Sequence, residues 1–143
     1  QSHVHDTLSI LASPDALPAL VHCASGKDRT GLIAALVLGI AGVPAETIAE
    51  DYGLTARFLH SRYLEAHPDV SAGDYTWQDY QNASCPPESM RGVLRHLDDR
   101  YGGVEGYALD TGVTQEREYR RLVATGDEAL AADQTVLAIE APV

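Results

Sequence analysis

The sequence predicts an α/β domain built around one strand-loop-helix unit. Residues 19–22 (Ala-Leu-Val-His) form a short apolar run, which suits a buried strand. Residues 30–41 are apolar on every side of a helix, which is typical of a helix inside a core. The loop between them contains Gly26, which permits unusual backbone angles.

Further helices are expected downstream of this unit. One begins near Pro44, with Ile48, Tyr52 and Leu59 facing inward, and residues 57–65 continue it or start another helix. A third, with a possible Ser84 cap and an apolar stripe, ends at Gly102-Gly103. The ranges expected to be helical are 86–101, 104–109 and 114–124.

Other segments are less regular. Residues 67–84 are rich in Asp, Ser, Gly and Pro and are predicted to be irregular, with aromatic residues that pack on the core. In residues 1–18, the segment 7–11 fits either the end of a helix or a short strand. We expect one domain over residues 1–125 and an acidic tail over 126–143, in which 136–139 could add an edge strand.

The composition restricts the partners. The chain has 143 residues, enough for one domain, and a formal net charge of -11. This charge disfavours nucleic acid and anionic membranes, but a local positive pocket can still bind a small phosphorylated substrate. No apolar run suggests stable membrane insertion, and we expect a cytoplasmic or secreted protein. Because the chain starts at Gln1, an N-terminal fragment of the same protein is an expected partner.

The loop after residue 22 has the chemistry of a phosphate-removing site. Cys23 precedes the start of a helix, whose N-terminal amides, together with Lys27 and Arg29, can lower a thiol pKa. Successive N–H groups in such a loop can surround phosphate oxygens, and Gly26 permits their close approach. A guanidinium at position 29 can bind two oxygens at once.

A two-step reaction follows from these groups. Cys23 would attack phosphorus to give a phosphocysteine, which water then hydrolyses. The Thr30 hydroxyl could bind the Cys23 sulfur and make it a better leaving group. A general acid should protonate the leaving oxygen of the substrate. No metal or organic cofactor is needed.

The string His-Cys-Ala-Ser-Gly-Lys-Asp-Arg-Thr-Gly, residues 22–31, resembles the signature of cysteine-dependent tyrosine phosphatases, in particular a bacterial branch. That resemblance implies a nucleophilic Cys23, a phosphate clamp at Arg29, and roles for Lys27 and Asp28. A lysine in this loop is similar to phosphoinositide phosphatases, so phosphorylated proteins and phosphoinositides are the implied substrates. The residues implied to surround the phosphate are Ala24, Ser25, Gly26, Lys27, Asp28 and Arg29.

The family resemblance also implies a fold, a central sheet flanked by helices, of which this chain is mostly the helical C-terminal part. Few residues precede Cys23, whereas family members have a long segment there that usually carries the acid. Either Asp28 takes the role of the acid, or the acid lies on a separate segment, which is the interpretation we favour. A module that binds phosphorylated ligands without turnover is the alternative function.

Two rival interpretations are weaker. Residues 45–63 resemble a helix-turn-helix through the segments 47–49, 53–55 and 58–59, but the acidic side chains there and the acidic chain as a whole disfavour DNA binding. The second cysteine, Cys85, has no neighbours that suggest chemistry and is expected to be structural.

Overall fold

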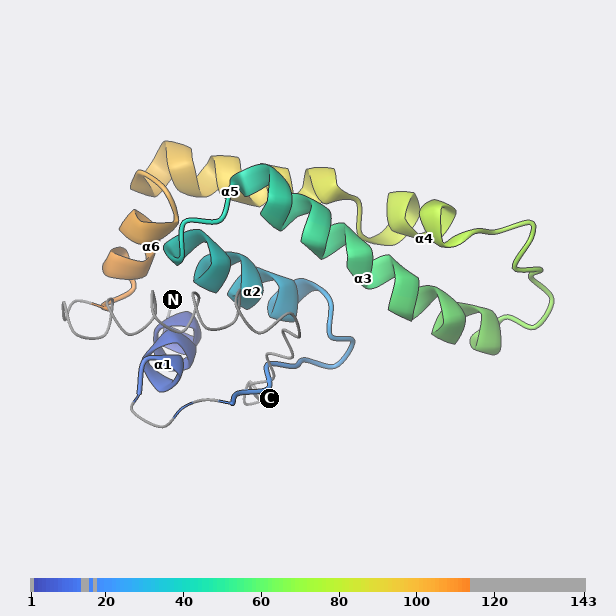
Figure 1. Cartoon of the computed structure of the whole chain (residues 1–143), viewed down its shortest axis with the longest axis horizontal. Helices are drawn as coiled ribbons and strands as arrows, with labels where there is room; N and C mark the ends of the chain where they lie inside the picture. The colour runs from blue at the N-terminus through green and yellow to red at the C-terminus, as the bar shows by residue number, and fades with distance from the viewer. Residues whose placement is uncertain (1, 14–15, 17, 114–143) are drawn as a thin grey trace.

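Helix α2 (Asp28–Ile40) lies at the centre of the fold (Figure 1). The computed structural model describes residues 2–13, 16 and 18–113. Helix α1 packs on one side of α2, while α3 and α6 contact it elsewhere and α5 runs along α3. The remaining helices are α1 (Ser2–Leu11), α3 (Ala45–Ala66), α4 (Trp77–Ser84), α5 (Pro87–Tyr101) and α6 (Val104–Asp110).

The prediction of a buried central helix is confirmed, and α2 begins two residues earlier than expected. None of residues 31–40 is exposed, because α2 separates two apolar clusters. Leu36 and Val37 belong to the first cluster, with residues of α1 and α6, and Ala35 belongs to the second, with residues of α3 and α5. The loop at residues 23–27 therefore precedes a helix that is anchored on both sides.

Helix α3 is one continuous helix of 22 residues, so residues 57–65 continue it. The helix-turn-helix interpretation is wrong, because Gly53 lies inside the helix and is buried. A Cβ at Gly53 would lie 2.7 Å from Gln81 Nε2 and 2.8 Å from Pro87 Cγ. The glycine therefore permits close packing of α3 against the α4–α5 segment, and Gln81 Nε2 donates to the Gly53 carbonyl at 2.9 Å.

Helix α4 corrects the prediction that residues 67–84 are irregular. Thr76 and Asp79 form a capping box in which the side chain of each accepts a hydrogen bond from the backbone N–H of the other. Ser84 is the last residue of α4 and does not cap α5, whose N-cap is Pro86. The prediction that aromatic residues of this segment pack on the core is confirmed for Trp77 and Tyr80, which pack against the second cluster.

The C-terminal part of the described fold follows the sequence pattern. Helix α5 ends at Gly102, whose φ of 74° is left-handed, and Gly103 N–H donates back to the Leu97 carbonyl at 3.1 Å. Helix α6 matches the expected helix at 104–109 to within one residue. The predicted helix at 114–124, the strand at 136–139 and the tail from 126 lie outside the described residues.

The N-terminal segment is helical, so the helix alternative for residues 7–11 is correct. In the predicted strand, Val21 is buried at 6% exposure, and Leu20 and His22 each form an isolated β bridge. No strand forms within residues 2–13, 16 and 18–113, and the central sheet stays a prediction. No helix in the described part of the chain is both long and apolar enough to cross a membrane.

Candidate active site

The loop from Cys23 to Arg29, which we call the cradle loop, joins the bridged segment at Leu20 and His22 to α2. Its last two residues form the start of α2, so the free N–H groups of the helix face the loop. Gly26 has φ 63°, a left-handed conformation that a residue with a Cβ rarely adopts. The predicted strand-loop-helix unit thus has its loop and helix in place.

Cys23 is a half-buried free thiol with a strongly shifted pKa. Burial by itself raises this pKa, but the Thr30 side chain and the backbone N–H groups of Thr30, Ser25 and Lys27 donate to the sulfur and lower it to about 6. The charges of Lys27 and Arg29, which the sequence suggests as a further cause, are not among the causes of this shift. The shift instead comes from hydrogen bonds to the sulfur, first from the Thr30 side chain and then from the backbone N–H groups of Thr30, Ser25 and Lys27.

The Thr30 hydroxyl interacts with the Cys23 sulfur, which is where the sequence predicts it. Its Oγ1 is buried and has no regular hydrogen-bond partner among the described residues, apart from its interaction with the Cys23 sulfur. Sulfur is a large, weak acceptor, so a long contact from a hydroxyl is expected there. A hydroxyl with no better acceptor is available to the thiolate.

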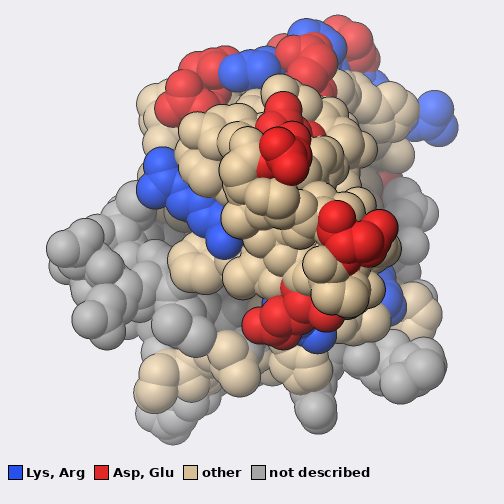
Figure 2. All heavy atoms as spheres, turned by 90° about the vertical axis from the view of Figure 1, so that its right-hand side faces the viewer, with Lys and Arg blue, Asp and Glu red and all other residues tan. Residues whose placement is uncertain are grey.

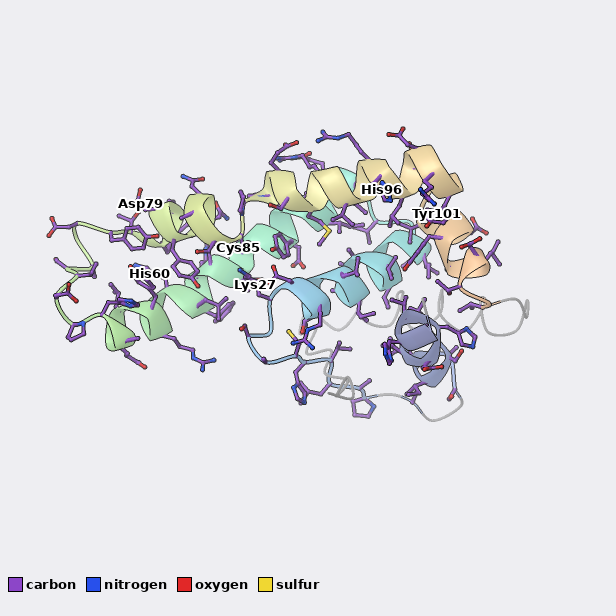
Figure 3. All side chains as sticks on the ribbon, turned by 180° about the vertical axis from the view of Figure 1, so that it is seen from behind. Lys27, His60, Asp79, Cys85, His96 and Tyr101 are labelled. Carbon is purple, nitrogen blue, oxygen red and sulfur yellow. The ribbon has the colours of Figure 1, made fainter. Side chains whose placement is uncertain are left out.

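Lys27 contributes its backbone and its side chain to different parts of the structure. The backbone N–H faces Cys23, whereas Nζ donates to the Ser84 carbonyl at 2.9 Å. Figure 3 shows the side chain reaching from the loop towards the junction of α4 and α5, where Cys85 lies. The ammonium therefore ties the cradle loop to the end of α4.

Asp28 is an exposed carboxylate at the first residue of α2. Its Oδ1 accepts a hydrogen bond from Tyr52 Oη at 2.9 Å, and its Oδ2 lies 3.7 Å from Lys27 Nζ. Burial of the Tyr52 phenol, the hydrogen bond and the negative charge of Asp28 all raise the Tyr52 pKa, so Tyr52 stays a donor. Both carboxylate oxygens of Asp28 thus face groups of the protein.

Arg29 is exposed on the first turn of α2. Its side chain borders an apolar cavity of about 110 Å³ between α1 and α2. Its guanidinium forms no hydrogen bond or ion pair with another residue of the described part of the chain, and its role as a clamp stays a prediction. The remaining predicted cradle residues, Ala24 and Ser25, are exposed in the loop.

Sequence reasoning missed two contacts of this site. Tyr52 was expected to face inward, and it does, but the sequence carries no sign that its hydroxyl reaches Asp28. The Ser84 carbonyl is a backbone group 57 positions from Lys27, so no sequence pattern identifies it. No group of three or more metal-ligating side chains gathers among residues 2–13, 16 and 18–113.

Comparison with known proteins places the chain in a family. The model of the tyrosine phosphatase family matches residues 1–124. This chain belongs to the tyrosine phosphatase family, as the motif at residues 22–31 predicted.

Two curated relatives support the assignment. A tyrosine-protein phosphatase of Nostoc commune is 35% identical over 118 residues, which are 75% of this chain and 38% of the relative. The triple specificity protein phosphatase PtpB of Mycobacterium tuberculosis is 30% identical over 127 residues, 80% of this chain and 45% of the relative. The chain thus spans less than half the length of these relatives. No solved structure is significantly similar.

Proposed function

We propose that this chain carries the catalytic loop of a phosphatase that hydrolyses phosphomonoesters, most directly phosphotyrosine in proteins. The supporting observation is the lowered pKa of Cys23, about 6, inside a loop whose N–H groups face the sulfur. At neutral pH such a group is about ten parts thiolate to one part thiol. The same donors can bind the equatorial phosphate oxygens as charge develops on them.

The reaction would proceed in two displacements. The Cys23 thiolate attacks phosphorus, the bond to the tyrosine oxygen breaks, and an acid gives that oxygen a proton. Water then attacks the phosphocysteine, the bond between sulfur and phosphorus breaks, and inorganic phosphate leaves with the thiolate restored. Thr30 would stabilise the departing sulfur, and Arg29 would swing to bind two phosphate oxygens.

Asp28 is a poor candidate for the acid of the first step, because Tyr52 donates to Oδ1 and Lys27 faces Oδ2. We therefore place the acid on a segment beyond these residues, which is supported by the greater length of both relatives. The phosphoinositide alternative depended on the Lys27 ammonium. Because that ammonium binds the Ser84 carbonyl, phosphotyrosine is the first substrate to test.

The experiment is rapid acid quenching of the 143-residue chain with p-nitrophenyl phosphate, followed by mass spectrometry of the peptide that contains Cys23. We expect a phosphocysteine in the wild type and none in Cys23→Ser. A wild type that binds inorganic phosphate but forms no phosphocysteine would leave only the binding module. Hydrolysis that persists in Cys23→Ser would refute the mechanism.

The leaving group tests the position of the acid. p-Nitrophenolate leaves without a proton, whereas the phenolate of phenyl phosphate needs one. If the acid is absent from this chain, the rate should fall steeply from p-nitrophenyl phosphate to phenyl phosphate. Equal rates for the two esters would mean that a residue within this chain supplies the proton.

A further inference from the structure

Tyr52 makes a contact with the cradle loop that the proposed chemistry does not explain. The residue lies in the middle of α3 and its side chain is 8% exposed, yet its hydroxyl emerges at the first residue of α2. There it donates to Asp28 Oδ1 at 2.9 Å. A buried ring that presents one polar atom to an exposed loop is well suited to fixing the position of that loop.

The packing around the Tyr52 ring supports a specific fit. A Cβ added to Gly31 would lie 2.7 Å from Cδ2 and 3.0 Å from Cε2 of Tyr52. The ring therefore lies directly on the first turn of α2, in space that only a glycine leaves free. Gly31 immediately follows the residues that donate to Cys23, so the ring and the cradle share one turn of helix.

The contacts continue from Asp28 into the cradle. Asp28 Oδ2 lies 3.7 Å from Lys27 Nζ, which is held by the Ser84 carbonyl at 2.9 Å. The Lys27 backbone N–H is one of the donors that face Cys23. Residues 27 and 28 are thus held between α3 and the end of α4, and one of them contacts the nucleophile.

Without the Tyr52 hydroxyl, the contact left to the Asp28 carboxylate in the described part of the chain is the longer one to Lys27 Nζ, at 3.7 Å. That carboxylate borders a cavity of about 220 Å³, lined also by Leu32, Met90 and Val93, into which it has room to move. The first turn of a helix is the part most prone to fraying, because its N–H groups have no partner within the helix. Movement there would displace the Lys27 N–H from the sulfur.

We propose that Tyr52 is a positioning residue of the cradle, whose hydroxyl holds Asp28 so that the adjacent Lys27 N–H stays directed at Cys23. This inference rests on the proposed function for its catalytic consequence, but not for the geometry it predicts. Tyr52 is not among the groups that donate a hydrogen bond to the Cys23 sulfur. It acts through the two loop residues next to it.

The test is the pH dependence of Cys23 alkylation by iodoacetamide in Tyr52→Phe, which keeps the ring and removes one oxygen. We expect the midpoint, about 6 in the wild type, to move to higher pH, because one donor to the thiolate is weakened. Binding of inorganic phosphate, measured by calorimetry at a pH where Cys23 is ionised, should weaken about fivefold. Tyr107→Phe in α6 is the matched control and should change neither value.

A double-mutant cycle tests whether Tyr52 acts on Cys23 through Asp28. In an Asp28→Ala background, Tyr52→Phe should cause no further change, because its partner is already absent. Gly31→Ala should reproduce the shift of Tyr52→Phe by displacing the ring. The proposal is overturned if Tyr52→Phe leaves the midpoint unchanged, or if it shifts the midpoint equally with and without the Asp28 carboxylate.

These outcomes are separate from those of the proposed function. Alkylation and phosphate binding need no turnover, so they test Tyr52 even if the chain hydrolyses no ester. If turnover is present, kcat/KM of Tyr52→Phe for p-nitrophenyl phosphate should fall about fivefold or more, with the thermal midpoint close to that of the wild type.

Discussion

The two cysteines of this chain have the same side chain but opposite environments. Cys23 is half-buried in a loop of inward-facing donors, and its pKa is lowered to about 6. Cys85 is completely buried between α4 and α5, and burial raises its pKa, although the charge of Lys27 partly opposes this. Burial penalises both thiolates, so the difference lies in the hydrogen bonds that only Cys23 receives.

The comparison shows that a nearby cation is not sufficient to make a reactive thiol. The charge of Lys27 acts to lower the pKa of Cys85, yet burial and the charge of Asp28 raise that pKa above its ordinary value. Lys27 acts on Cys23 through its backbone N–H. Directed hydrogen bonds from the Thr30 hydroxyl and from backbone N–H groups therefore lower a thiol pKa more than the charge of Lys27, whose ammonium donates to the Ser84 carbonyl.

Replacing each cysteine in turn should give the largest difference between the two. Cys23→Ser should lower kcat for p-nitrophenyl phosphate by at least about a thousandfold, because an alcohol is ionised far less than a thiol near neutral pH. Cys85→Ala is the matched control and should keep kcat within about twofold. Similar losses in both variants would mean that the buried cysteine takes part in catalysis.

Arg29→Lys should have the next largest effect. The charge is retained but the two parallel N–H donors are lost, and we expect kcat to fall about 100-fold. Steady-state kinetics with p-nitrophenyl phosphate measures this, and Arg57→Lys on α3 serves as the control. A loss below about threefold would show that Arg29 acts only as a diffuse charge.

The pH dependence of the alkylation rate should also distinguish Cys23 from Cys85. Its alkylation rate should rise with pH through about 6 and then level off, while Cys85 should react only after unfolding. Thr30→Val removes the hydroxyl donor and should move the midpoint of Cys23 upward. An unchanged midpoint would assign the low pKa to the backbone donors alone.

The lowered pKa of Cys23 should also make the free energy of unfolding depend on pH. The folded-state pKa of Cys23 lies below the ordinary thiol value of 9.0, so the folded chain favours the thiolate. This contribution is complete above pH 9 and is lost as the pH falls through about 6. Urea unfolding across this range should show the loss in the wild type, and Cys23→Ser should lack it.

The smallest expected effect concerns Cys85. Cys85→Ala removes one buried sulfur from the second cluster and should lower the free energy of unfolding by about 1–2 kcal/mol. Urea unfolding at neutral pH measures this change. A stability equal to that of the wild type would mean that the surrounding residues close the cavity.

The acidic composition is consistent with the surface that the structure presents. On the face of the molecule shown in Figure 2, acidic and basic side chains are interspersed, and the basic ones do not gather into a continuous surface. That face therefore offers no broad basic surface to an anionic partner.

The sequence predicted helices best where periodicity and end signals agreed. The apolar run of α2 and the Gly102-Gly103 end of α5 each identify a helix. Helix α4 was missed because its capping box uses Asp79, within a segment rich in turn-forming residues. Gly53 permits close packing against Gln81 and Pro87. Because these residues lie far along the chain, the role of Gly53 could not be inferred from its sequence neighbours.

The same division applies to the site. By itself the sequence determined the loop and the helix after it and predicted Cys23 as the nucleophile, because thiolate chemistry at a helix N-terminus requires these residue types within a few positions of one another. Only the tertiary structure decided that Tyr52 holds Asp28 and that the Lys27 ammonium binds Ser84. These contacts join α3 and α4 to the loop, and their geometry depends on how the helices pack, which local sequence patterns do not specify.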